Sequence, residues 1–343
     1  MVLVTIPFKD NTDDDYALRQ LNRALKSLAA QTSPFFTTLI VLDGGIRPDH
    51  KNQFQALKET YPFLIKKVED GKTGAGAARQ VGIDFAFSEK FGQLFTYKYL
   101  IFLDSDDMLL PNAIEDLARA AQSSNFDVVV SPIIAETNLI EKSIIPAEKN
   151  TTWTHGTIYS TKFLYNNKIR FYEDIQGNED SAFNLLANTL SRKNRGIIEI
   201  PTYLWIYNPA SVTRTDPKYF ASWATPQYIL GISRAILEIL GKDSEFDKNL
   251  IYSIIELYHK YELCQEKEWF GTPEESLGIT NNLKALFGRK EIQELLKEEK
   301  AQEAIARNVH GAEWCCEEKI CFNEGFDWWV KGWTEPKYME DCE

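Results

Sequence analysis

The sequence predicts an α/β protein with a mostly parallel central sheet, followed by a C-terminal helical region. Over residues 1 to about 130, short apolar runs rich in β-branched and aromatic residues alternate with stretches whose apolar residues recur at helical spacing. This alternation is typical of parallel strands covered by helices on both faces. After about residue 217, the pattern changes to successive amphipathic helices.

The expected strands are short and apolar, and they cover residues 2–7, 36–42, 64–68, 97–103 and 127–132. The helices expected between them cover residues 16–31, 53–61, 75–87 and 111–123. Ligands of such sheets bind at the carboxyl ends of the strands. We therefore expect the polar residues that follow Ile6, Leu42 and Leu103 to lie along one edge of the sheet.

A domain boundary is expected near Asp216 and Pro217, which divides the chain into residues 1–215 and a helical accessory region, residues 216–343. Within the first part, residues 151–215 contain several turn signals and are expected to be more irregular. The accessory helices are expected over residues 219–240, 247–267, 274–287 and 290–307. A tail rich in tryptophan and cysteine begins at Trp314.

The composition excludes some classes of protein. The formal net charge of −12 argues against a broad electrostatic grip on nucleic acid or on an anionic membrane. No run approaches 18 apolar residues, so no transmembrane segment is expected. The first residues carry neither a basic region nor a cleavage site, which predicts a cytoplasmic protein with reduced thiols. Cys315, Cys316 and Cys321 are expected to be packed thiols, because their spacing does not match a standard zinc site.

Three carboxylates, those of Asp104, Asp106 and Asp107, follow the apolar run 97–103. Clustered carboxylates repel one another and are costly to desolvate, so they belong at the end of a buried strand, where something must neutralise them. A divalent cation such as Mg²⁺ or Mn²⁺ fits, because both favour carboxylate oxygens and leave positions open for phosphates. The alternative is a solvated, Asp-rich turn that caps the next helix.

A second candidate is Arg79, which stands in the first turns of a helix that follows Gly74 and Gly76. The turn does not match a dinucleotide fingerprint, because Arg79 occupies the position of the third glycine. An arginine near a helix N-terminus is poorly placed for the helix dipole and makes better sense if it reaches a phosphate or a carboxylate. An exposed arginine after a glycine turn is the alternative.

Three further positions carry candidate chemistry. Asp180 precedes an apolar helix, where a carboxylate serves either as a cap or as a general base at a pocket edge. His155 stands at the start of an expected strand, where it is either structural or a further ligand of a metal at the acidic cluster. Arg214 follows a strand-like run in a segment that is either a loop closing over a diphosphate or a polar linker.

Taken together, these motifs resemble the family 2 glycosyltransferases, whose nucleotide-binding domain has the GT-A fold. The resemblance covers about residues 1–215 and keeps the family's order and approximate spacing. It rests on residues 4–11, 41–45, 76–82, 102–107, 155–159, 168–171, 179–180 and 211–214. It implies an inverting enzyme that moves a sugar from a nucleotide-sugar donor to an acceptor hydroxyl.

The resemblance also implies roles for the donor side of the site. Pro7 would line the nucleobase pocket and Asp43 would hydrogen-bond the base. Asp104 would reach the ribose or the sugar. Asp106 would coordinate Mn²⁺ or Mg²⁺, and Asp107 would lie near the donor sugar.

For the reacting groups, the resemblance implies that Asp180 is the general base, with Glu179 beside it. Arg79 would contact the nucleotide or its diphosphate, and Arg214 would lie on the loop that covers the diphosphate. The metal and the arginines would stabilise the charge that develops on the leaving phosphate. Apart from the resemblance, His155 is expected to be a further metal ligand or a substrate contact if the acidic cluster holds a metal.

The chain departs from the family pattern at three places. Residues 42–45 read Leu-Asp-Gly-Gly where two acids and a serine are common, and Gln80 replaces the usual asparagine. A second acidic pair, Glu173 and Asp174, lies six residues before the Glu179 and Asp180 pair. We prefer Asp180 as the base because an apolar helix follows it.

The expected donor is UDP-linked, and the expected acceptor is a surface glycan. Two alternatives stay open: a phage-type enzyme that glycosylates a hydroxymethylated DNA base, and a non-catalytic sugar-binding relative. A flipped base would need stacking aromatics, which the tryptophan-rich tail contains, whereas the acidic charge argues against DNA. A nucleotidyltransferase is disfavoured, because residues 7–11 do not form a glycine-rich basic loop.

Overall fold

The computed structural model describes residues 1–12, 14–87, 96–138, 140–150, 152–211, 214, 216–242, 248–269 and 271–295, and every structural statement below concerns these residues. The chain divides into two compact units, Met1–Pro217 and a second unit that begins at Lys218. The tryptophan- and cysteine-rich tail lies outside the described residues, as does the part of the last expected helix beyond residue 295.

The first unit is built on a seven-stranded sheet with strand order β10-β6-β9-β4-β1-β2-β3. Its strands are β1 (Val2–Phe8), β2 (Phe36–Leu42), β3 (Leu64–Lys67), β4 (Tyr99–Phe102), β6 (Val128–Val130), β9 (Thr157–Ser160) and β10 (Arg195–Ile197). Strand β9 runs antiparallel to both of its neighbours, and all other pairings are parallel. The predicted mostly parallel sheet is therefore confirmed.

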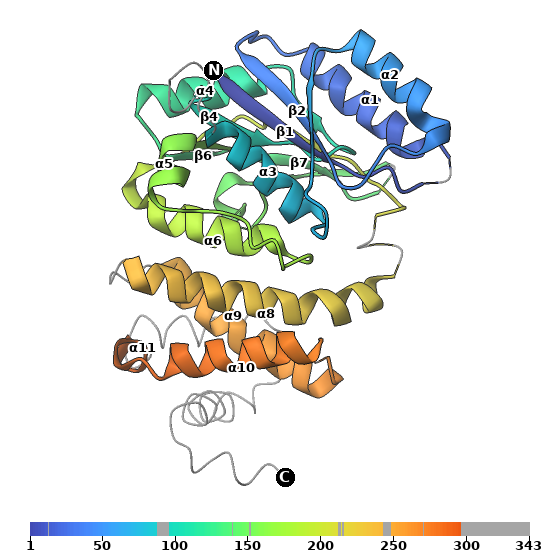
Figure 1. Ribbon diagram of the computed structural model, residues 1–343. Helices are drawn as coiled ribbons and strands as arrows, with labels where there is room; N and C mark the ends of the chain where they lie inside the picture. Colours follow the sequence, from blue (N-terminus) through green and yellow to red (C-terminus); the bar gives the residue numbers. More distant parts are fainter. Residues whose placement is uncertain are drawn as a thin grey trace. The chain divides into compact units, whose positions relative to one another are not determined.

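Helices cover both faces of this sheet, as Figure 1 shows. One face carries α1 (Tyr16–Ala29), α2 (Lys51–Thr60) and α4 (Ala113–Ser123), and the other carries α3 (Ala75–Phe87), α5 (Thr161–Asn166) and α6 (Glu179–Ser191). Alternate residues of β1 point to opposite faces. Val2, Val4 and Ile6 therefore join the core beneath α1, while Thr5 faces α3. Helix α3 packs closely there because residue 82 is glycine, and a Cβ at this position would lie 2.5 Å from Thr5.

A small second sheet was not foreseen from the sequence. It has the order β5-β11-β7-β8, with strands β5 (Met108–Leu109), β7 (Ile133–Glu136), β8 (Lys142–Ile145) and β11 (Tyr203–Trp205). These strands have two to four residues each, which is too short to establish a period of two in the sequence. Residues 151–215, expected to be irregular, in fact contain β9, α5, α6, β10 and β11, with a 3-10 turn at Arg192–Asn194.

The second unit is helical, as the sequence predicts. It contains α8 (Pro217–Lys242), α9 (Lys248–Lys267), α10 (Pro273–Phe287) and α11 (Lys290–Leu295). Thr272 and Glu275 form a reciprocal capping box that fixes the start of α10. None of the described helices combines the length and the apolar character needed to cross a bilayer.

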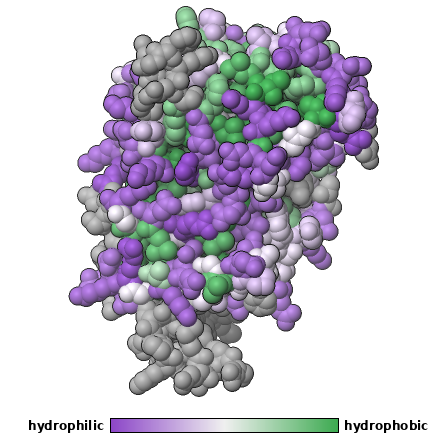
Figure 2. Space-filling model, in the orientation of Figure 1, coloured by the Kyte–Doolittle hydropathy of each residue, from purple (hydrophilic) through white to green (hydrophobic). Residues whose placement is uncertain are grey.

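Hydrophilic side chains predominate on the face shown in Figure 2, in keeping with a chain that is 26% charged.

Candidate active site

Four strands of the large sheet deliver polar side chains to a single edge. Strands β1, β2 and β4 are parallel neighbours, so Pro7, Asp43 and Asp104 all lie at or just after their carboxyl ends. Strand β9 is antiparallel to β4, so its first residues reach this edge too. His155, two residues before β9, thus lies beside Asp104. The predicted gathering of polar residues at this edge is confirmed.

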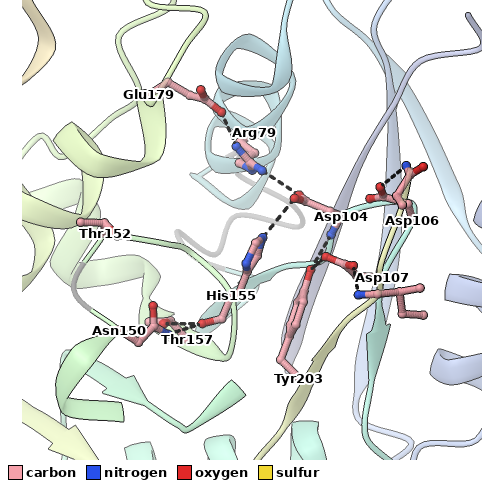
Figure 3. A network of polar contacts seen from close by, with 12 residues as sticks. Arg79, Asp104, Asp106, Asp107, Asn150, Thr152, His155, Thr157, Glu179 and Tyr203 are labelled. Atoms are coloured by element: carbon pink, nitrogen blue, oxygen red, sulfur yellow. Dashed lines mark hydrogen bonds and ion pairs between the residues drawn. The ribbon is translucent and has the colours of Figure 1, made fainter. Parts of the chain in front are cut away.

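Asp104 is the centre of a buried network of charges, drawn in Figure 3. Its Oδ1 lies 2.7 Å from Nη2 of Arg79, and its Oδ2 lies 3.1 Å from Nε2 of His155. The other side of the Arg79 guanidinium contacts Glu179, with 2.6 Å between Nη1 and Oε1. Of the two partners that the sequence left open for Arg79, a phosphate or a carboxylate, the structure shows carboxylates. Arg79 joins the end of β4 to the start of α6.

A glycine allows α3 and α6 to approach closely enough for this network. A Cβ built on Gly76 would lie 2.8 Å from Cγ of Glu179, which is closer than real contacts permit. Any larger residue at position 76 would push Glu179 away from Arg79. Gly76 therefore lets α3 and α6 pack closely, and Gln80 of α3 links to the loop before α6, since its side-chain oxygen accepts a 2.9 Å hydrogen bond from the Phe171 amide.

The charges in the network shift one another's pKa values. Burial by itself would raise the pKa of Asp104, but the charge of Arg79 and the hydrogen bond with His155 hold it below its usual range. Burial would lower the pKa of His155, yet the contact with Asp104 raises it. Burial, reinforced by Asp180, raises the pKa of Glu179 to about 7 despite the opposing charge of Arg79.

Asp107 is held by groups from the segment around β11. Its Oδ2 accepts a 2.7 Å hydrogen bond from the hydroxyl of Tyr203, and its Oδ1 accepts a 2.8 Å bond from the Ile206 amide. The Tyr203 hydroxyl in turn accepts a 3.2 Å bond from the Asp104 amide. Burial and the neighbouring Asp106 charge raise the pKa of Asp107 to about 8.

Asp104, Asp107 and His155 form a candidate metal centre. Each offers one ligand atom, and these atoms lie within 4.8 Å of one another. Carboxylate oxygens and an imidazole nitrogen form a donor set that suits Mn²⁺. The Nδ1 atom of His155 is buried without a hydrogen-bond partner, whereas 26% of the Asp104 side chain is exposed to solvent. The donor atoms and their spacing therefore fit a cation.

Asp106, expected to coordinate the metal, lies outside that group of three. Its carboxylate accepts a 2.8 Å hydrogen bond from Nδ2 of Asn208, whose own Oδ1 accepts a bond from the Tyr16 hydroxyl. Its backbone carbonyl accepts a bond from Arg23. Burial and the charge of Asp104 raise the pKa of Asp106. This environment fixes Asp106 beside the candidate centre.

Asp180 follows Glu179 in the first turn of α6 and is partly buried. Burial raises its pKa, although the charges of Arg79 and His155 oppose the shift. The competing acid Glu173 is engaged elsewhere, with 2.7 Å between its Oε2 and Nζ of Lys72. Asp180 thus interacts electrostatically with the network, and Glu173 pairs with Lys72.

The residues expected to hold the nucleobase lie on the β1 and β2 side of the edge. The Asp43 carboxylate accepts hydrogen bonds of 2.9 Å from the Thr73 hydroxyl and 3.0 Å from the Gly74 amide. Nζ of Lys9 lies 3.2 Å from the same carboxylate. Asp43 thus anchors the turn that starts α3, and Pro7 is half-buried in β1 beside it.

Arg214 packs on aromatic rings rather than on the acidic network. Its guanidinium carbon lies 4.6 Å from the ring centre of Tyr207 and 5.3 Å from that of Trp205. Trp205 also packs against Trp153, with 5.8 Å between ring centres. Val212 and Thr213, part of the expected diphosphate loop, lie outside the described residues.

Sequence reasoning missed Tyr203, Asn208 and Trp153. Tyr203 and Trp205 share a face of β11 and could have been found from a period of two, but a strand of three residues gives no reliable signal. Asn208 and Trp153 lie outside regular strands and carry no motif. Their roles follow only from the partners that the fold brings to them.

Comparison with known proteins agrees with this geometry. Residues 11–175 match the model of the family described as Glycosyl transferase family 2; the match ends just before Glu179 and Asp180. The chain shares its fold with S. aureus TarS (residues 1–349), at a TM-score of 0.58 and 16% identity over 86% of this chain and 82% of TarS.

The crystal structure of TarS 1–349 in complex with UDP-GlcNAc gives the same TM-score of 0.58 and 16% identity, over 90% of this chain and 84% of that one. No curated protein matches the chain by sequence. The family match, the shared fold and the charged network at the sheet edge lead to one conclusion. Residues 11–175 of the chain match the family 2 glycosyltransferases, and the chain is a glycosyltransferase for a nucleotide-sugar donor.

Proposed function

We propose that this glycosyltransferase moves a sugar from a UDP-linked donor to a hydroxyl of a glycan, in a metal-dependent reaction that inverts the anomeric carbon. The observation that carries the proposal is the cluster of Asp104, Asp107 and His155 joined to Arg79 at the carboxyl edge of the sheet. The choice of UDP is supported by TarS, which was crystallised with UDP and with UDP-GlcNAc.

Asp104, Asp107 and His155 would hold the cation, Mn²⁺ or Mg²⁺, with Asp106 as the neighbouring ligand that the family resemblance implies. The bound cation would stabilise the negative charge that develops on the leaving diphosphate. Arg79 fixes the orientation of Asp104 and adds positive charge nearby. Arg214 would supply a second positive charge to the diphosphate.

The sheet order separates the donor's two ends. Pro7 belongs to β1 and Asp43 directly follows β2, on one side of β4, and both would contact the nucleobase. His155 lies two residues before β9, on the other side of β4. A donor whose diphosphate lies at Asp104 would therefore point its sugar toward the β9 side.

Asp180 is the proposed general base. It accepts the proton of the acceptor hydroxyl as that oxygen attacks the anomeric carbon from the face opposite the diphosphate. Its raised pKa favours this role, because a base with a pKa closer to neutrality takes up a proton more readily. Glu179 stays bound to Arg79 and holds α6 in place.

A glycan acceptor is supported by the pair of half-buried tryptophans near His155. Trp205 lies 6.3 Å from the His155 ring and 5.8 Å from Trp153, measured between ring centres. Large aromatic side chains offer flat apolar surfaces for ligands of mixed polarity, such as sugar rings. The pair lies on the β9 side, where the sugar is expected.

The test measures hydrolysis and transfer with a panel of nucleotide sugars, with and without Mn²⁺. We expect turnover of a UDP-sugar that needs the cation, and proton NMR should show a β-linked product from an α-linked donor. Retention of the α-configuration would contradict a single displacement. Absence of any turnover would favour a non-catalytic sugar-binding relative.

The DNA-modifying alternative is tested separately, by a gel shift with duplex DNA containing hydroxymethylated bases at low salt. We expect no binding, given the net charge of −12. A stable complex would instead favour that alternative.

The cytoplasmic location expected from the sequence stays a prediction.

A further inference from the structure

One buried tyrosine contacts all three residues of the candidate metal centre. The hydroxyl of Tyr203 donates to Oδ2 of Asp107 at 2.7 Å and accepts from the Asp104 amide at 3.2 Å. Its ring stacks on the imidazole of His155, with 4.7 Å between centres and 19° between planes. Figure 3 shows the Tyr203 hydroxyl against the Asp107 carboxylate and the backbone nitrogen of Asp104, with His155 beside its ring.

These contacts restrict the freedom of each ligand separately. The hydrogen bond selects one orientation of the Asp107 carboxylate, whose other oxygen is held by the Ile206 amide. The bond to the Asp104 amide fixes the backbone where the chain turns after β4. The stacked ring fixes the plane of the imidazole, so that Nε2 faces Asp104.

We propose that Tyr203 is a positioning residue that pre-orders Asp104, Asp107 and His155 for cation binding. The inference rests on the proposed function, because it needs a metal at these ligands. Residues that orient ligands from behind change metal affinity by about 10- to 100-fold when they are removed. A neutral hydroxyl suits this place, since it orients a carboxylate without neutralising the charge that attracts the cation.

Tyr203 differs in this respect from another fully buried tyrosine, Tyr159 of β9. The hydroxyl of Tyr159 donates to Oδ1 of Asn184 at 2.7 Å, and its ring packs on Phe102 and Phe183. None of these partners is a candidate ligand. Tyr159→Phe therefore removes a buried hydroxyl and its hydrogen bond without touching the proposed centre, which makes it the matched control for Tyr203→Phe.

The experiment titrates Mn²⁺ into the full-length protein without donor, following free Mn²⁺ by electron paramagnetic resonance. We expect Tyr203→Phe to weaken Mn²⁺ binding about tenfold or more, and Tyr159→Phe to leave the affinity within about twofold of wild type. In turnover with a UDP-sugar, Tyr203→Phe should need more Mn²⁺ for half-maximal rate, while its kcat at saturating Mn²⁺ should stay close to wild type.

A double-mutant cycle with Asp107→Asn tests the route of the effect. If the hydroxyl acts through Asp107, Tyr203→Phe should add little to the loss of affinity already caused by Asp107→Asn. Unchanged Mn²⁺ affinity in Tyr203→Phe would overturn this inference but leave the proposed function standing. A wild-type protein that binds no Mn²⁺ would overturn both the inference and the metal dependence of the proposed reaction.

Discussion

Nη2 of Arg79 lies 2.7 Å from Oδ1 of Asp104, and this contact joins the glycine-rich start of α3 to the acidic end of β4. Both side chains belong to motifs that are separate in the sequence. Their charges compensate each other in a buried place, where an unpaired charge would be costly. The same guanidinium contacts Glu179, so the Arg79 side chain links one carboxylate after β4 to one at the start of α6.

Arg79→Lys should therefore lower kcat/KM by about a hundredfold while the protein stays folded. Lysine keeps the charge but lacks the planar fork that contacts Asp104 and Glu179 together. Steady-state kinetics with a UDP-sugar and calorimetric melting would measure both effects. Arg170→Lys is the matched control, because Arg170 pairs with Asp84 at the surface, with 3.4 Å between Nη2 and Oδ1. An equal loss in both variants would contradict the prediction.

Mn²⁺ binding should weaken as the pH falls below about 8, where the pKa of Asp107 lies. A raised pKa means that the carboxyl group holds its proton at a higher pH, and a cation must displace that proton before it binds. Asp106 and His155 also have raised pKa values and should act in the same direction. Dissociation constants at pH 6.5, 7.5 and 8.5, with calorimetry in two buffers to count released protons, provide the measurement. An affinity that rises on acidification would be incompatible with this site.

Asp180→Asn should lower the rate of sugar transfer about 100-fold or more. A UDP-sugar and Mn²⁺ should still raise the melting temperature of this variant. Asparagine keeps the shape of the side chain but cannot accept the proton. Glu173→Gln is the comparison, since it removes the competing acid and its contact with Lys72. That variant should keep near wild-type turnover. Full activity in Asp180→Asn would show that another group is the base.

Trp153→Ala should raise the KM for a glycan acceptor about tenfold and leave hydrolysis of the UDP-sugar unchanged. The reason is that Trp153 packs on Trp205, outside the charged network that would hold the donor. Trp153→Phe keeps a flat ring and should restore most of the acceptor affinity. If donor hydrolysis fell in parallel with transfer, the tryptophan would belong to the donor side instead.

The local pattern of the chain determined the large sheet and most of its helices. Strand β2 and helix α3 coincide with the expected ranges 36–42 and 75–87, because both are segments rich in apolar residues that the fold buries, and turn residues stand beside each of them. The sequence also predicted that the carboxylates of residues 104–107 lie at the end of a strand, because clustered charges follow a buried strand rather than interrupt it. The position of Arg79 suggested that it reaches a phosphate or a carboxylate, and the structure pairs it with the carboxylates of Asp104 and Glu179.

Only the tertiary structure decided which side chains meet. The antiparallel course of β9 brings His155 to the carboxyl edge beside Asp104, and no local pattern specifies the direction of a strand. Tyr203 reaches Asp104 and Asp107 from a strand of three residues almost a hundred positions further along the chain. Propensity and periodicity describe residues that are near neighbours in the sequence. The contacts of His155 and Tyr203 join residues far apart in the sequence, and they depend on how the strands and the two sheets are arranged in the fold. The sequence thus determined the elements and the charged groups, and the packing of the fold decided their partners.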